Sequence, residues 1–220
     1  MKDSTLKRLA VVILLAVSSM NASAQTGNSD TTGLGAIKKF YAARDAEFAD
    51  PAQSPIPEGD RKEFKGLCYF NIDLSYRVKA KFTKTASPVL FRMLTTGTRR
   101  PEYVKFGEVE FRHAGTTYRL GVYQSQDLKK VSGYEDYLFI PFTDATNGHD
   151  TYAVGRYIDF RIPHDGAGDV IIDFNQCYYP SCAYGRSVYS CPIPPQENTL
   201  PIAIQAGERN CAGAKPSGKH

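Results

Sequence analysis

The chain has 220 residues, of which 27 are basic and 23 acidic, and 42% are hydrophobic. This near-balance of charge argues against nucleic acid or an anionic membrane surface as the partner. The length fits one β-rich domain, because sheet-based domains reach this size without splitting.

The N-terminus has the pattern of a secretory signal peptide. Lys2, Lys7 and Arg8 precede an apolar run over residues 9–17, and Ala22-Ser23-Ala24 supplies a small-residue cleavage site. The apolar run is about half the roughly 20 residues that cross a bilayer. We therefore expect residues 1–24 to be removed and the protein to be exported, periplasmic or secreted, with no integral membrane segment in the mature chain.

The mature chain would hold 24 basic and 22 acidic side chains. Its first stretch, residues 25–34, is polar and is expected to be a disordered linker, as released termini usually are. A helix of about three turns should follow from residue 35, because Ile37, Tyr41 and Phe48 recur on roughly one helical face. Asp50-Pro51 should end it, because a residue before proline disfavours the helical conformation.

Seven later segments have the composition of β-strands. In the clearest, residues 70–82, apolar and polar side chains alternate over the whole length, and Asp73 is a position where the strand could bend. The other six are residues 89–96, 103–112, 116–123, 137–142, 157–162 and 170–175.

No helical pattern separates these strands, which disfavours parallel βαβ units. The short connections favour an antiparallel meander that forms a sandwich or a partly closed barrel, mainly β with one N-terminal helix. We expect a single β-rich domain over residues 35–209 and a flexible tail over residues 210–220.

The C-terminal part of the chain carries a family resemblance. The run DFNQCYYPSCAY begins at Asp173, and SCPIPPQENTLPIAIQAGE ends at Glu208. Both resemble the C-terminal signature of an uncharacterised prokaryotic family, the domain of unknown function 1684. The runs SPIP, FKGLCYF and FIPFTDATNGHDTYAVGRYIDF resemble further family segments in the same order. The resemblance implies no activity, cofactor or catalytic residue, and the chain departs from the family pattern at Cys177 and Tyr179.

Five cysteines in an exported chain allow two disulfides and one leftover thiol. The resemblance points to a Cys182–Cys191 disulfide, and the eight residues between these two suit a loop that folds back in an oxidising compartment. The expected result is a disulfide-stapled, proline-rich C-terminal segment. A zinc site is the weaker alternative, since no zinc-type spacing appears. Pairing among Cys68, Cys177 and Cys211 stays open.

Polar side chains gather at the ends of the predicted strands, where loops on a rigid scaffold collect binding groups. Arg156 offers a planar fork that matches a carboxylate. If Asp173 and Glu197 were buried together, the pKa of one would rise and make it a proton donor. We therefore expect one partly open pocket built from Asp144, Thr146, Tyr152, Arg156, Tyr157, Asp173, Asn175, Glu197 and Asn198.

Three functions stay open for this set. The first is a binding module for a small polar or amphipathic ligand. The second is a hydrolase that uses Asp173 or Glu197 as acid or base and Arg156 as anion stabiliser. The third is a structural or assembly-interface protein. A buried ion pair can also simply brace loops, and we favour that interpretation of the network.

Known catalytic and cofactor motifs are missing from the sequence. The four histidines show no metal-binding spacing, and there is no phosphate loop, dinucleotide fingerprint or serine nucleophile elbow. We expect no metal and no cofactor. A small-molecule ligand remains the possible partner, and the sequence does not determine the oligomeric state.

Overall fold

The structure is a computed structural model that describes residues 33–186 and 188–211. The signal peptide, most of the linker and residues 212–220 lie outside the described residues, so the expectations for them stay predictions. Among the described residues, no helix combines the length and apolar character that a membrane crossing requires.

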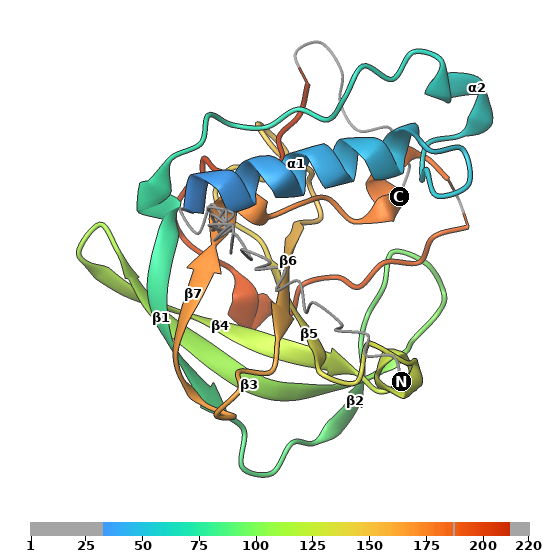
Figure 1. The fold of residues 1–220 in the computed structure, drawn as a ribbon. Coiled ribbons are helices and arrows are strands. Elements are labelled where there is room, and N and C mark those ends of the chain that lie inside the picture. Colours follow the sequence, from blue (N-terminus) through green and yellow to red (C-terminus); the bar gives the residue numbers. More distant parts are fainter. Residues whose placement is uncertain (1–32, 187, 212–220) are drawn as a thin grey trace, which may run out of the picture.

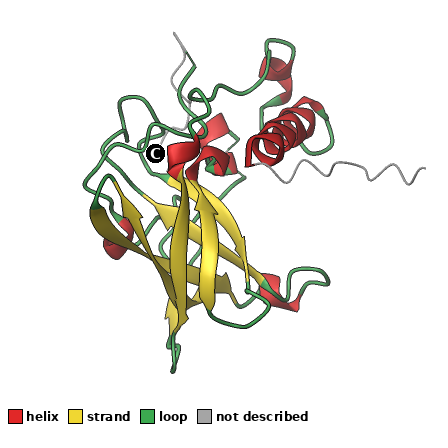
Figure 2. Ribbon diagram, turned by 60° about the vertical axis from the view of Figure 1, so that its left-hand side comes forward, coloured by secondary structure: helices red, strands yellow, loops and turns green. Residues whose placement is uncertain are grey.

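Two helices precede the sheet. Helix α1 (Gly33–Ala49) begins two residues before the expected domain boundary and ends just before Asp50-Pro51, as predicted. It buries Ile37 and Phe48 and lies across one end of the curled sheet (Figures 1 and 2). The short α2 (Glu58–Arg61) follows.

All seven predicted strand segments contribute to one sheet. Its strands are β1 (Arg77–Lys84), β2 (Leu90–Arg92), β3 (Glu102–His113), β4 (Thr116–Ser125), β5 (Tyr137–Phe142), β6 (Arg156–Arg161) and β7 (Gly168–Asp173). Their order is β6-β5-β4-β3-β1-β7, with β2 paired to β3, and every pairing between these strands is antiparallel. The mainly β, antiparallel prediction is confirmed, and the sheet curls into a half barrel (Figure 2).

The first predicted strand is shorter than its alternation suggested. Asp73 accepts a hydrogen bond from the backbone N–H of Ser75 and caps the 3-10 helix η1 (Leu74–Tyr76). This local bond replaces strand pairing, so β1 starts only at Arg77. Side chains alternate buried and exposed from there on, as predicted.

The curl of the sheet depends on a close approach between two strands. The β3–β4 register shifts between Lys105 and Gly107. A Cβ at Gly107 would lie 2.5 Å from the ring of Phe82 on β1, so a larger residue would push the strands apart. Register shifts such as the one between Lys105 and Gly107 bend a sheet strongly. The core lies inside the curl and includes Phe82, Val109, Leu120, Ile140 and Ile172.

The two edge strands, β6 and β7, are not paired with each other, which leaves the barrel half closed. A cleft of about 250 Å³ lies between them, and Ala36 and Phe40 of α1 form part of its lining.

The C-terminal segment follows β7 and contains three 3-10 helices, η3 (Phe174–Gln176), η4 (Ser181–Tyr184) and η5 (Gln196–Asn198). It runs back between α1 and the strands (Figure 1). Cys68 and Cys211 form a disulfide that ties its end to the segment after α2. The backbone N–H of Asn210 donates to the carbonyl of Asp150, which holds this end of the segment against the loop after β5.

The predicted Cys182–Cys191 disulfide is wrong in this structure. Both residues are buried free thiols, as is Cys177. The backbone N–H of Cys182 donates to the sulfur of Cys191 at 3.2 Å. The loop thus brings the two residues together as expected, without a covalent bond between their sulfurs. The disulfide of the C-terminal segment is instead the one between Cys68 and Cys211.

Candidate functional site

Of the nine residues predicted for one pocket, Tyr157 lines a different pocket and Tyr152 is buried in a cluster with Tyr179 and Ala183. The other seven fall into three separate polar networks.

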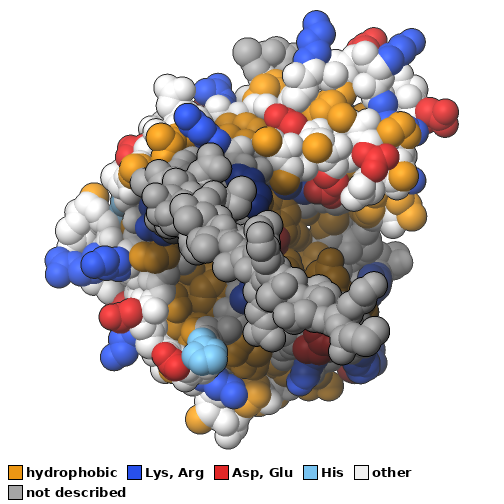
Figure 3. Space-filling model, viewed as in Figure 1, with side chains coloured by type: hydrophobic (Ala, Val, Ile, Leu, Met, Phe, Trp, Pro, Cys, Tyr) orange, Lys and Arg blue, Asp and Glu red, His pale blue; other side chains and the backbone are white. Residues whose placement is uncertain are grey.

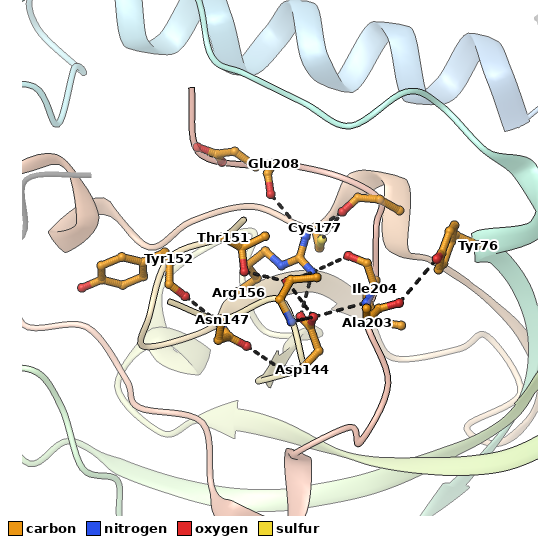
Figure 4. A network of polar contacts seen from close by, with 12 residues as sticks. Tyr76, Asp144, Asn147, Thr151, Tyr152, Arg156, Cys177, Ala203, Ile204 and Glu208 are labelled. Carbon is orange, nitrogen blue, oxygen red and sulfur yellow. Dashed lines mark hydrogen bonds and ion pairs between the residues drawn. The ribbon is translucent and has the colours of Figure 1, made fainter. Parts of the chain in front are cut away.

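The first network is centred on Arg156, at the start of β6, whose side chain is fully buried. Its guanidinium donates to Asp144 at 2.7 Å and to the backbone carbonyls of Ile204 at 2.8 Å and Ala206 at 2.6 Å. Figure 4 shows these contacts converging on one arginine. The expected pairing of Arg156 with a carboxylate is therefore present.

The carboxylate of Asp144 also accepts hydrogen bonds from its neighbours. Thr146 donates to Asp144 through both its backbone N–H, at 2.8 Å, and its hydroxyl, at 2.6 Å. Asp144 also accepts from the backbone N–H of Ile204 at 3.2 Å. The ion pair is buried on both sides. This network braces the loop after β5 and the C-terminal segment against the start of β6, and it has no open face for a ligand.

The second network joins β7 to the chain that precedes β1. Asp173 accepts from the backbone N–H of Asn175 at 3.1 Å and lies 3.6 Å from Arg77. Asn175 receives the backbone N–H of Asp73 on its oxygen at 3.0 Å and donates its amide to the Asp73 carbonyl at 2.9 Å. The side-chain amide of Asn175 thus pairs with both backbone groups of Asp73, as the backbone of a neighbouring strand would.

The third network anchors η5 on the sheet. The side chain of the buried Asn198 makes three hydrogen bonds, two with the backbone of Gly121 and one to the carbonyl of Pro141. Glu197 lies beside it and pairs with Lys105 at 2.7 Å and with the hydroxyl of Tyr123. Partial burial alone would raise the pKa of Glu197, but the bonds from Lys105 and Tyr123 outweigh it and leave that pKa below its usual value.

Asp173 and Glu197 consequently belong to different networks, and no hydrogen bond or ion pair among the described residues joins them. The described residues also contain no group of three or more His, Cys, Asp or Glu side chains placed to hold a metal ion.

A separate pocket of about 380 Å³ opens between β5, β6 and the C-terminal segment. Of the nine residues predicted for the polar pocket, Tyr157 alone lines it, and Cys191 of the predicted disulfide lies in its wall as well. We call it the tyrosine pocket, because its aromatic wall consists of Tyr103, Tyr137, Phe139, Tyr157, Tyr178 and Tyr189. Hydrophobic side chains gather around the hollowed part of the face below α1 in the space-filling view (Figure 3).

Three of the tyrosines of this wall are fixed by hydrogen bonds. The hydroxyls of Tyr137 and Tyr178 both donate to Asp159, at 2.6 Å and 2.5 Å. Tyr157 donates to the backbone carbonyl of Pro192. Burial, with nearby anionic groups, raises the pKa of all three phenols, so they stay neutral over the ordinary pH range. Their rings therefore form a rigid, uncharged surface.

Among the described residues, Arg99 is the one charged residue in the lining of this pocket. Its side chain is 64% exposed and lies 3.5 Å from the exposed Asp127. Such an exposed pair is weak, so the guanidinium is available to a ligand. The site therefore combines planar aromatic contact area with one cation at its edge.

Sequence reasoning missed this pocket, although β5 carries a signal for it. All but the first of the residues from Tyr137 to Phe142 are buried, on both faces of the strand. An antiparallel strand with one wet face would alternate. The apolar run therefore indicated a second covered face, which the aromatic wall provides.

Comparison with known proteins agrees with this fold. Residues 62–209 match the model of a family described as protein of unknown function (DUF1684). The chain belongs to this family. A similar solved structure is that of an uncharacterised protein of Haloarcula marismortui, determined by solution NMR. It is 33% identical, with a TM-score of 0.63, over 80% of this chain and 94% of that one. No curated protein matches the chain.

Proposed function

We propose that this protein is an exported binding module whose tyrosine pocket holds a small amphipathic ligand, a planar ring with an anionic group. The observation that carries the proposal is the pocket of about 380 Å³ with an aromatic wall and, in its described lining, Arg99 as the only charged residue. Aromatic faces stack on flat rings, and a guanidinium favours carboxylate or sulfonate partners. Export rests on the signal-peptide pattern of residues 1–24.

Binding is the function that this geometry supports better than hydrolysis. Catalysis by two carboxylates needs both to face one reacting bond, and Asp173 and Glu197 are engaged in separate networks. An assembly interface would instead expose a broad apolar patch, whereas the aromatic side chains of the tyrosine pocket are buried or half-buried.

Calorimetry with three probes tests the proposal. We expect 2-naphthoate to bind at least tenfold more tightly than cyclohexanecarboxylate, which lacks the flat ring, and several-fold more tightly than 2-naphthol, which lacks the anion. The Arg99→Gln variant should lose the preference for naphthoate over naphthol. Its matched control is Arg100→Gln, since Arg100 is also exposed but bonds to the carbonyl of Gly97 and does not line the pocket.

A filling variant locates the site. Leu128 lines the tyrosine pocket and is partly exposed, so Leu128→Trp should obstruct the pocket without disturbing the core. Naphthoate binding that survives this change, or that fails to exceed cyclohexanecarboxylate binding in the natural chain, would refute the proposal. Export is checked separately by the intact mass of the protein from the cell envelope or medium, where a chain beginning at Gln25 is expected.

A further inference from the structure

A second pocket lies at the other side of the C-terminal segment, beside the Cys68–Cys211 disulfide. We call it the disulfide pocket. Its volume is about 210 Å³, far above the roughly 10–15 Å³ that a single water needs. Most of its wall is apolar and comes from Ile56, Phe64, Leu67, Ala183 and Tyr184. It shares no lining residue with the tyrosine pocket.

One wall residue of the disulfide pocket is a buried carboxylate. The side chain of Glu208 is only 2% exposed. Its backbone carbonyl faces Arg156, and its carboxyl group points away from that arginine (Figure 4). The carboxyl oxygen Oε2 accepts the backbone N–H of Tyr179 at 2.9 Å.

The nearest cation does not neutralise Glu208 well. Arg44 of α1 approaches Oε2 only to 4.0 Å. Its guanidinium donates instead to Glu47 at 3.1 Å and lies over the rings of Phe48 and Tyr178, at 4.8 Å and 4.7 Å. A buried carboxylate without a close partner is costly, so a cation that enters the pocket would gain strongly from it.

The other charged residues of the lining do not oppose a cation. Asp60 is exposed and acidic. The side chain of Arg209 is turned to the surface, where it lies over the ring of Phe70 at 5.2 Å and donates to the carbonyl of Asn210. The wall also contains the hydroxyl of Tyr184, which is buried and has no hydrogen-bond partner within the described chain.

We infer that the disulfide pocket is a second binding site, which takes a small apolar amine whose ammonium group pairs with Glu208. The apolar body of the amine fills the space between Leu67 and Tyr184. This inference does not depend on the tyrosine pocket, and the two ligands have opposite charge.

Three probes that share a phenyl body and differ in the head group test it on the full chain. They are 2-phenylethylamine, 2-phenylethanol and 3-phenylpropionate, measured by calorimetry at pH 8.5. Burial raises the pKa of Glu208 to about 7, so at pH 8.5 its carboxylate is ionised. We expect the amine to bind at least tenfold more tightly than the alcohol, and the propionate to bind most weakly.

Two variants separate charge from shape. Glu208→Gln keeps an oxygen for the Tyr179 N–H and should reduce amine affinity to that of the alcohol. The matched control is Glu58→Gln, which removes the same charge from α2 outside the pocket lining and should leave binding unchanged. Ile56→Trp should fill the pocket and abolish binding of the amine, which gives a second measurement should Glu208→Gln fail to fold.

Backbone NMR signals locate the bound amine. Supporting results are shifts at Leu67 and Tyr184 with the tyrosine pocket unaffected. The inference is overturned if the amine binds no better than the alcohol, if its affinity survives Glu208→Gln or Ile56→Trp, or if the shifts occur only at Tyr137 and its neighbours. Loss of naphthoate binding in the tyrosine pocket leaves this result untouched, so the two proposals fail separately.

Discussion

Replacing Arg156 by lysine is the sharpest test of the bracing network. Arg156 donates to Asp144 and to the carbonyls of Ile204 and Ala206 from a fully buried position, over distances of 2.6–2.8 Å. Lysine keeps the charge but loses the planar fork, so it cannot reach all of these oxygens at once. Hydrogen bonds to charged groups contribute about 1.5–3 kcal/mol each, and breaking a buried ion pair costs about 3–5 kcal/mol.

We therefore expect Arg156→Lys to lower the free energy of unfolding by about 3 kcal/mol. Equilibrium urea unfolding followed by tyrosine fluorescence measures this as a lower midpoint at unchanged slope. The matched control is Arg161→Lys on the same strand. Arg161 is half exposed and bonds to the exposed Asp136, so its replacement should change stability by less than about 0.5 kcal/mol.

A loss below about 1 kcal/mol for Arg156→Lys, equal to that of the Arg161 control, would refute the assignment as a brace. The functional interpretation of Arg156 would then regain support if the same variant lost ligand binding while its stability was unchanged.

Three further outcomes follow from the described contacts. Asn198→Asp should cost about 2–4 kcal/mol in urea unfolding, because it replaces an amide donor to the carbonyls of Gly121 and Pro141 by an acceptor. For Glu208, burial raises the pKa from 4.5 to about 7. Its contribution to the free energy of unfolding is therefore present below pH 4.5 and is lost as the pH rises through 7, by at most about 3 kcal/mol. Unfolding measured from pH 4 to 8.5 should show this loss in the natural chain and not in Glu208→Gln. Thiol titration of the denatured, non-reduced protein should count three free thiols, and a count of one would contradict the assignment of Cys177, Cys182 and Cys191.

The sequence by itself determined the elements of this fold. Alternation along β1 and the clear turns around the later strands carry the antiparallel sheet, because the period of two is a local property of the chain. Pro51 likewise ends α1 through the local conformation of the residue before it. The Arg156–Asp144 contact was also within reach, because only 12 residues separate the two and both flank the same loop.

Tertiary structure alone decided which polar groups share a space. Asn198 meets Gly121 across 77 residues and Cys68 meets Cys211 across 143, and sequence spacing carries no information about such distances. The curl of the sheet buried Arg156 and Asp144 against each other, and it left the aromatic side of β5 and the residue Glu208 in the linings of two pockets. Buried polar groups need partners wherever the chain can supply them, so the networks around Arg156, Asp173 and Asn198 include contacts between residues far apart in the sequence.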